Sequence, residues 1–324
     1  MSTPREAIVD RATEEFLEAA ARNPPPPPES LTIEMFRAAV ESYRAQGFPR
    51  EEVAEVRDLE IPVGVVGGRV PVRLYLPAVD APPALIVWAH GGSWTRIYVD
   101  LIDSHFPVYA NRSSCAIAAV DYRLAPEARF PVAVEDVYAT AAWLRANGAR
   151  LGCDPDRIAV AGESTGAGLA AAATLLDRER REVGIAHQTL IIPLLDAALE
   201  SESWNRLEGR YLLARPPLRW ALAQYAPGVA ASDPLLSPLR EADHRGLPPA
   251  LVVAAELDPL RDDAERYAAK LRAAGIDVDY RCEKGLIHHA IMVPKAIPRA
   301  GALLESVAAE VGRVLRDGAR DRRS

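Results

Sequence analysis

The chain alternates short apolar runs with amphipathic stretches. The runs 84–90 (ALIVWAH) and 115–122 (CAIAAVDY) contain few polar residues, which is typical of strands covered on both faces of a parallel sheet. Further strands are predicted at 157–162, 188–196, 250–258 and 278–285. Apolar residues at helical spacing predict helices between and after these strands, over 131–148, 166–180, 262–275 and about 294–316. This alternation predicts an α/β fold with a mostly parallel central sheet flanked by helices.

Two amphipathic helices are predicted before the first strand. The first occupies 5–22, where apolar residues recur every three or four positions, and the second runs over 33–45. Thr32 or Ser30 is placed to cap the second helix. The proline run 24–28 separates the two helices as a stiff connector.

A β-hairpin is predicted ahead of the parallel strands. Residues 61–66 and 69–76 are rich in valine and flank the pair Gly67-Gly68. Two glycines between apolar runs favour a tight hairpin turn, because glycine adopts positive φ without steric penalty.

Residues 201–246 interrupt the alternation of strands and helices. They contain helical pieces, prolines and aromatic residues but no clear strand. We expect this segment to lie over the sheet together with the N-terminal helices. The predicted organisation is therefore a core formed by 51–200 and 247–324, with 1–50 and 201–246 as two cap segments.

Composition and charge narrow the class of protein. The chain has 324 residues, 49% of them hydrophobic, and a net charge of −7. A surface of this sign predicts no binding to nucleic acid or to an anionic membrane. The sequence has no run of 18 apolar residues and no basic start followed by an apolar stretch, so we expect a cytoplasmic protein. Its three cysteines form no CxxC pair, and their odd number argues against a disulfide framework.

The sequence GESTG (162–166) fits the G-x-S-x-G nucleophile elbow, with Ser164 at the turn between a predicted strand and a predicted helix. The elbow raises the serine hydroxyl above the sheet edge, and the helix start favours a developing negative charge. A dinucleotide fingerprint is the rival interpretation of Gly162, Gly166 and Gly168. It is disfavoured because several strands precede these glycines, whereas that fingerprint normally follows the first strand.

A second glycine motif, HGGSW (90–94), directly follows a predicted buried strand. Consecutive glycines let backbone N–H groups approach a ligand closely, although a tight turn after a strand would also use them. Its position upstream of the elbow favours an oxyanion hole, to which Thr165 after the nucleophile would add an N–H group. The candidate donors are the N–H groups of Gly91, Gly92, Ser93 and Thr165.

Candidate partners for the serine follow in the order acid, then histidine. Asp258 ends a predicted strand, and His288 follows the last predicted strand. The imidazole would accept the serine proton, and the carboxylate would orient it. Other candidates for these roles remain on the residues alone, namely Glu256, Asp262 and Asp263 for the acid and His289 for the base. The spacing of metal-binding motifs is absent, so no metal is expected.

Taken together, these motifs resemble those of the hormone-sensitive-lipase-like carboxylesterases, also called bacterial family IV, of the α/β-hydrolase superfamily. The resemblance covers the chain from about residue 60 onward. It is carried by HGGSW (90–94), DYRLAPE (121–127), GESTGAG (162–168), the acid segment 247–263 and GLIHHA (285–290). The resemblance implies Asp258 and His288, in preference to their neighbours, as the partners of Ser164. It also implies a helical cap and cofactor-free hydrolysis of small esters with short or medium acyl chains. Many members are dimers, which leaves a homodimer open here.

Several positions depart from the family motifs. Ser93 replaces a glycine, Thr165 replaces alanine, Glu163 replaces aspartate and His289 replaces glycine. These departures concern the substrate more than the chemistry, so a biosynthetic hydrolase, lactonase or cyclising enzyme stays open as an alternative. The candidate pocket residues are Trp94, Glu163, Trp204, Tyr211, Trp220 and His289.

A binding protein without catalysis is the remaining alternative. Plant gibberellin receptors resemble the same family but lack the catalytic histidine. His288 is present here together with Ser164 and Asp258, which favours an enzyme.

Overall fold

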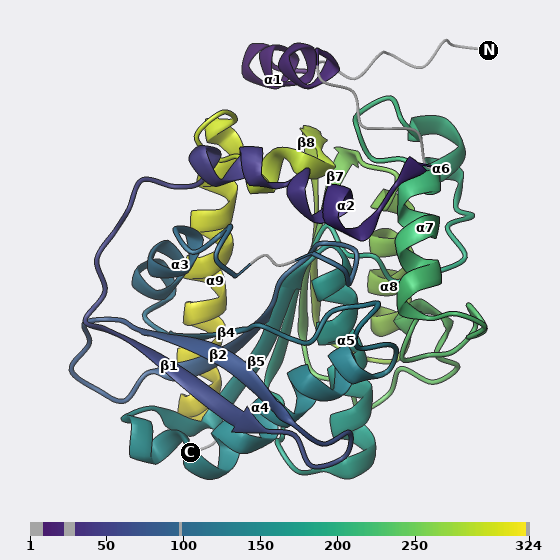
Figure 1. The fold of residues 1–324 in the computed structure, drawn as a ribbon. Helices are drawn as coiled ribbons and strands as arrows, with labels where there is room; N and C mark the ends of the chain where they lie inside the picture. Colours follow the sequence, from purple (N-terminus) through teal and green to yellow (C-terminus); the bar gives the residue numbers. More distant parts are fainter. Residues whose placement is uncertain (1–8, 23–29, 97–98, 322–324) are drawn as a thin grey trace.

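The computed structural model describes residues 9–22, 30–96 and 99–321, and one eight-stranded sheet forms its centre (Figure 1). The sheet order is β1-β2-β4-β3-β5-β6-β7-β8. The strands are β1 (Glu55–Pro62), β2 (Arg69–Leu76), β3 (Ala84–Ala89), β4 (Ala116–Val120), β5 (Asp154–Glu163), β6 (His187–Ile191), β7 (Ala250–Leu257) and β8 (Val278–Ile287). β2 pairs antiparallel with β1 and β4, and all other pairs are parallel. The predicted α/β-hydrolase fold is confirmed.

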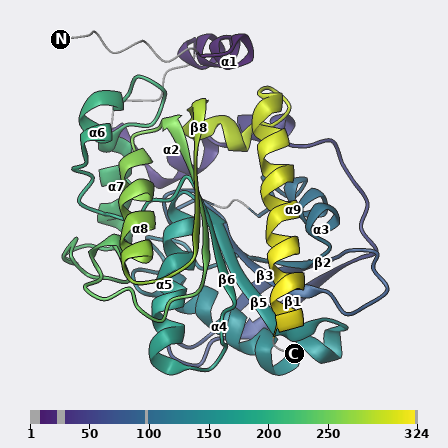
Figure 2. The ribbon, with the colours of Figure 1, turned by 180° about the vertical axis from the view of Figure 1, so that it is seen from behind.

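Helices cover both faces of the sheet. α3 (His105–Ser113) and α9 (Pro298–Asp321) lie against one face. α4 (Val132–Asn147), α5 (Thr165–Arg180) and α8 (Arg261–Ala273) lie against the other, as the front and back views show (Figures 1 and 2). Among the helices of the described chain, none is both long and apolar enough to cross a bilayer.

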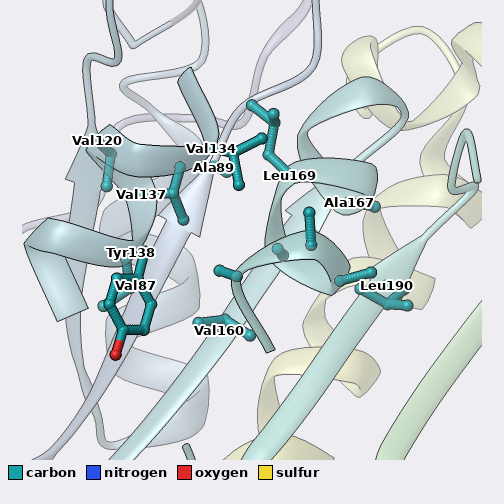
Figure 3. Packing of buried hydrophobic residues seen from close by; sticks show 14 of the residues in the cluster. Val87, Ala89, Val120, Val134, Val137, Tyr138, Val160, Ala167, Leu169 and Leu190 are labelled. Carbon is teal, nitrogen blue, oxygen red and sulfur yellow. The ribbon is translucent and has the colours of Figure 1, made fainter. Parts of the chain in front are cut away.

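The apolar strands supply side chains to both layers because successive residues of a strand point to opposite faces. In β3, Val87 and Ala89 join the cluster under α4 and α5, whereas Ile86 and Trp88 join the cluster under α3 and α9. Figure 3 shows the first of these clusters, where Tyr138 of α4 packs with the strand residues. Burial on both faces explains why these strands lack polar alternation.

Two predicted strands differ from the structure. The hairpin strand predicted over 61–66 is β1, which begins at Glu55 and ends at Pro62. β1 is an edge strand with mostly exposed or half-buried side chains, so its apolar signal is weak. The strand predicted over 188–196 ends at Ile191, because Ile192 adopts φ 43° and the chain turns there.

Two helices also differ. The helix predicted over 33–45 is α2 (Ile33–Ala38) followed by a separate 3₁₀ helix, η2 (Glu41–Gln46). Thr32 caps α2, since its side chain accepts a hydrogen bond from the N–H of Met35. Helix α3 was not predicted. Most of its residues are buried, so it lacks the amphipathic contrast by which a helix is recognised.

Helices of the two predicted cap segments lie near the carboxyl ends of the parallel strands, with α1, α2 and α6 at the top of Figure 1 and α7 below α6. They are α1 (Arg11–Ala21), α2, η2, α6 (Glu202–Leu207) and α7 (Arg215–Tyr225). The two sequence segments meet where the rings of Phe36 and Trp220 lie 5.3 Å apart between centroids. The parts of the predicted N-terminal cap at 1–8 and 23–29 lie outside the described residues.

Candidate active site

The candidate residues converge because they follow parallel strands of one sheet. His90 comes directly after β3, Ser164 after β5, Asp258 after β7 and His288 after β8. The carboxyl ends of parallel strands share one edge, so four segments far apart in sequence meet there.

Ser164 occupies a strained turn between β5 and α5. Its backbone has φ 54° and ψ −122°, a region that residues other than glycine rarely adopt. The turn is packed against the end of β3. A Cβ added at Gly162 would lie 2.5 Å from the carbonyl oxygen of Ala89, and one at Gly166 would collide with the same oxygen. Only glycine fits at these two positions, which explains the spacing of the G-x-S-x-G motif.

A chain of hydrogen bonds joins the three candidate catalytic side chains. Nδ1 of His288 lies 2.7 Å from Oδ2 of Asp258, and Nε2 lies 3.1 Å from Oγ of Ser164. Asp258 is fully buried, and its Oδ1 accepts a hydrogen bond from the N–H of Leu260. The carboxylate favours the tautomer with the proton on Nδ1, in which Nε2 can accept a hydrogen bond from the Ser164 hydroxyl.

The alternative candidates have other contacts. Asp262 accepts hydrogen bonds from the Ser203 N–H and from Arg261, and Glu256 accepts them from Lys284 and the Gly285 N–H.

Two more alternatives also lie apart from the hydrogen-bond chain. Within the described chain, Oδ2 of Asp263 and Nδ1 of His289 have no hydrogen-bond partner. Burial lowers the pKa of His289 to about 3, so its ring is neutral at ordinary pH. Neither side chain is placed to complete a relay with Ser164.

The candidate oxyanion donors divide into two groups. The N–H of Gly91 donates to Oε1 of Glu163 at 2.7 Å, and the N–H of Ser93 donates to Oγ1 of Thr165 at 3.0 Å. The N–H groups of Gly92 and Thr165 make no hydrogen bond to any described residue. The predicted set of four donors thus contains two that are already engaged and two that are open.

A pocket of about 550 Å³, partly open to solvent, lies over Ser164 and His288. Of the six predicted pocket residues, only Glu163 and His289 line it. Its remaining wall is mainly aliphatic, formed by Ile192, Leu194, Leu213, Leu218, Leu260, Ile291 and Met292. Single aliphatic residues scattered over several loops carry no motif, so the sequence did not reveal them.

The four aromatic residues among the predicted pocket residues do not line the pocket over Ser164. Trp94 is buried and stacks on Tyr225, with 4.9 Å between ring centroids. Trp204 is fully buried in the core, and Tyr211 and Trp220 are not among the lining residues. Large rings bury the most apolar area when they pack between elements, and here they fix the covering helices to the core.

Comparison with known proteins places the chain in a family. Residues 86–292 match the α/β-hydrolase fold family. The chain is 34% identical to an arylesterase of Saccharolobus solfataricus, over 84% of this chain and 90% of the relative. It is 36% identical to carboxylesterase NlhH of Mycobacterium tuberculosis, over 83% and 86%. The solved structure of an ester hydrolase from the Lake Arreo metagenome superposes with a TM-score of 0.88 at 32% identity, covering 94% of this chain and 99% of that one.

The chain belongs to the hormone-sensitive-lipase-like carboxylesterase family of the α/β-hydrolase superfamily. Its departures from the family motifs now have structural positions. Thr165, where the motif has alanine, occupies the Ser93 N–H with its hydroxyl. Ser93 itself lines the pocket with φ 55°.

Glu163, where the family motif has aspartate, joins the elbow to the oxyanion loop. Its Oε1 accepts from the Gly91 N–H, and its Oε2 accepts from Nε1 of Trp88 at 2.7 Å. The side chain is buried, and burial raises the pKa of Glu163 to about 8. This carboxyl group holds the loop that carries Gly92 next to the nucleophile.

Among the described residues, no group of three or more His, Cys, Asp or Glu side chains is arranged to hold a metal ion.

Proposed function

We propose that this carboxylic ester hydrolase works as a serine esterase that forms an acyl-enzyme on Ser164. The observation that carries the proposal is the hydrogen-bond chain from Asp258 through His288 to the Ser164 hydroxyl. The presence of all three groups in contact supports an enzyme over a binding protein without catalysis.

In the first half-reaction, Oγ of Ser164 attacks the ester carbonyl while Nε2 of His288 takes its proton. The buried carboxylate of Asp258 stabilises the imidazolium that forms. The imidazolium then gives the proton to the leaving alcohol. In the second half-reaction, the same imidazole takes a proton from water, which attacks the acyl-enzyme. The imidazolium then returns this proton to Oγ of Ser164 as the acid leaves.

The negative charge on the carbonyl oxygen needs donors that are open in the free enzyme. The N–H groups of Gly92 and Thr165 meet this condition, and Thr165 is the first residue of α5. The helix N-terminus adds favourable dipole potential at that place. Glu163 acts in this scheme as a positioning residue for the loop.

The aliphatic wall of the pocket supports short or medium acyl chains as substrates. The covering helices α1, α2, η2, α6 and α7 support a cap over this pocket, formed by the described parts of 1–50 and by 201–246. Trp220→Ala, which removes the ring contact with Phe36, should change the ratio of kcat/KM for butyrate and octanoate esters. An unaltered ratio would argue against a cap that shapes the pocket.

The nucleophile is tested with p-nitrophenyl butyrate and a fluorophosphonate probe. Wild-type protein should hydrolyse the ester and become labelled on Ser164. Ser164→Ala should lose labelling and roughly 10⁴- to 10⁶-fold in kcat. Ser201→Ala, a serine outside the pocket lining, is the control and should keep both properties. Labelling that persists in Ser164→Ala would reassign the nucleophile.

A further inference from the structure

Arg96 contributes a cation to the wall of the active-site pocket. It follows the oxyanion loop by a few residues, and its backbone N–H donates to the carbonyl oxygen of Gly92 at 3.2 Å. Its side chain lines the same pocket as Ser164 and His288. The guanidinium lies over the Phe36 ring, with Cζ 3.7 Å from the ring centroid. The pocket wall therefore contains a positive charge that an aromatic ring covers on one side.

No described residue neutralises this charge. Arg96 makes no ion pair with any described carboxylate, and its buried Nε has no hydrogen-bond partner there. Other arginines of the covering layer differ in having a carboxylate partner. Arg37 pairs with Glu127 at 2.8 Å. Arg215, whose Cζ lies 5.6 Å from the Trp204 ring centroid, pairs with Glu208 at 3.1 Å, although its Nε, like that of Arg96, has no hydrogen-bond partner in the described chain. A partly buried guanidinium with unsatisfied donors is unfavourable unless a ligand supplies acceptors.

The other titratable groups of the pocket do not compete for Arg96. The Asp258 carboxylate is occupied by His288 and the Leu260 N–H. Both oxygens of Glu163 already accept N–H donors. His289 lies close enough to Arg96 for the guanidinium to contribute to its lowered pKa, and its neutral ring carries no charge to pair. The pocket thus combines aliphatic walls with one uncompensated cation.

We propose that Arg96 binds a carboxylate of the substrate, so that the preferred substrates are esters bearing a second, free carboxylate. Stacking on Phe36 covers a face of the guanidinium and leaves its edge to bind a carboxylate through two parallel N–H···O bonds. Two kinds of ester meet this description, the monoesters of dicarboxylic acids and the esters of hydroxy acids. This inference rests on the proposed esterase function and names its substrate class.

The test compares anionic and neutral esters of matched length. The acyl arm uses monoethyl adipate against ethyl hexanoate, and the alcohol arm uses 4-(butyryloxy)butyrate against butyl butyrate. Acid release in a pH-stat gives kcat/KM for each ester. The ratio of anionic to neutral kcat/KM should exceed one in the wild type on at least one arm. It should fall about ten- to hundredfold in Arg96→Gln on that arm, the range for hydrogen bonds to a charged group.

Arg96→Lys and Arg215→Gln are the matched variants. Lysine keeps the charge without the planar fork, so Arg96→Lys should recover part of the ratio. Arg215→Gln removes an equal charge from a stacked arginine that is already paired, and it should leave the ratio unaltered. A ratio that is the same in wild type and Arg96→Gln on both arms would overturn the inference, as would an equal fall in Arg215→Gln.

If Arg96→Gln fails to fold, the wild-type ratio of anionic to neutral kcat/KM tests the inference by itself. A ratio above one on either arm supports the inference, and a ratio well below one on both arms overturns it. Failure of the esterase function itself is distinguishable, because the wild type would then hydrolyse neither the neutral nor the anionic esters.

Discussion

The pocket over Ser164 has two walls, here called the reaction wall and the cover wall, which differ in whether their polar groups have hydrogen-bond partners. The reaction wall consists of the loop 91–93, Glu163, Ser164 and His288. The side chains of Glu163, Ser164 and His288 are hydrogen-bonded to each other, to Asp258 or to backbone. The cover wall contains Arg96 and His289, whose buried Nε and Nδ1 have no hydrogen-bond partner in the described chain.

The contrast separates chemistry from selection of the substrate. Groups that act in the transition state are effective when they are held in place beforehand, and the reaction wall is built in that way. Groups that select a substrate need open donors that the substrate completes. The cover wall carries such a donor group in Arg96. One departure from the family motifs, His289, lies on this wall, whereas the departures at Ser93, Glu163 and Thr165 lie in or against the reaction wall.

The largest expected effect separates His288 from His289, neighbours in sequence that belong to opposite walls. His288→Ala should lower kcat for p-nitrophenyl butyrate by roughly 10⁴- to 10⁶-fold, because the proposed general base is lost. His289→Ala should lower kcat less than about tenfold and act mainly on KM, since it removes a pocket contact only. Steady-state kinetics of both variants provides the measurement. If His288→Ala and His289→Ala lost kcat equally, the two histidines would not have the different roles assigned to the two walls.

The next effect concerns the hold of Glu163 on the oxyanion loop. In Glu163→Gln, one oxygen acceptor becomes an NH₂ group that faces an N–H donor, Gly91 or Trp88. We expect kcat to fall roughly ten- to hundredfold, which is less than the 10²- to 10³-fold typical for loss of an oxyanion donor. KM should change little. Glu163→Asp, which restores the residue type of the family motif, should recover part of kcat. If Glu163→Gln changed KM and left kcat unaltered, the positioning role would be contradicted.

The same carboxyl group should also appear in the pH dependence of stability. Burial raises the pKa of Glu163 to about 8 in the folded protein, so the folded state binds this proton more tightly than the unfolded state. The contribution of this protonated carboxyl group to the free energy of unfolding is therefore fully present below the ordinary carboxyl pKa, and it is lost as pH rises through about 8. Urea unfolding at pH 5 to 9 should show a smaller decline in Glu163→Gln than in wild type. If the free energy of unfolding depended on pH equally in wild type and Glu163→Gln, the Glu163 carboxyl group would not have the raised pKa.

The smallest effect is expected at Ser93, which lines the pocket with φ 55°. A residue with a Cβ pays a penalty of about 1–2 kcal/mol in this left-handed region. Ser93→Gly should therefore raise the free energy of unfolding by about 1 kcal/mol, and it should broaden acceptance of branched acyl groups. Ser93→Ala is the control, because it removes the hydroxyl but keeps the strain. If the two variants have equal stability, backbone strain is not the cause.

Much of the fold was predictable because burial leaves a direct trace in the sequence. The central strands β3, β4 and β5 are apolar on both faces, and the glycines around Ser164 are required by the collision with β3. Edge strand β1 and helix α3 were misplaced or missed, since one is too exposed and the other too uniformly buried to show a periodic pattern.

The sequence alone determined the α/β fold and the order of Ser164, Asp258 and His288, because strand–turn–helix motifs are local. Only the tertiary structure decided which polar atoms are occupied. Whether the N–H of Gly91 is open or bound to Glu163, and whether Arg96 has a carboxylate partner, depends on residues that lie far apart in the chain. Distances of a few ångströms between separate loops are set by the packing of the whole sheet edge, and no local pattern of residues records them.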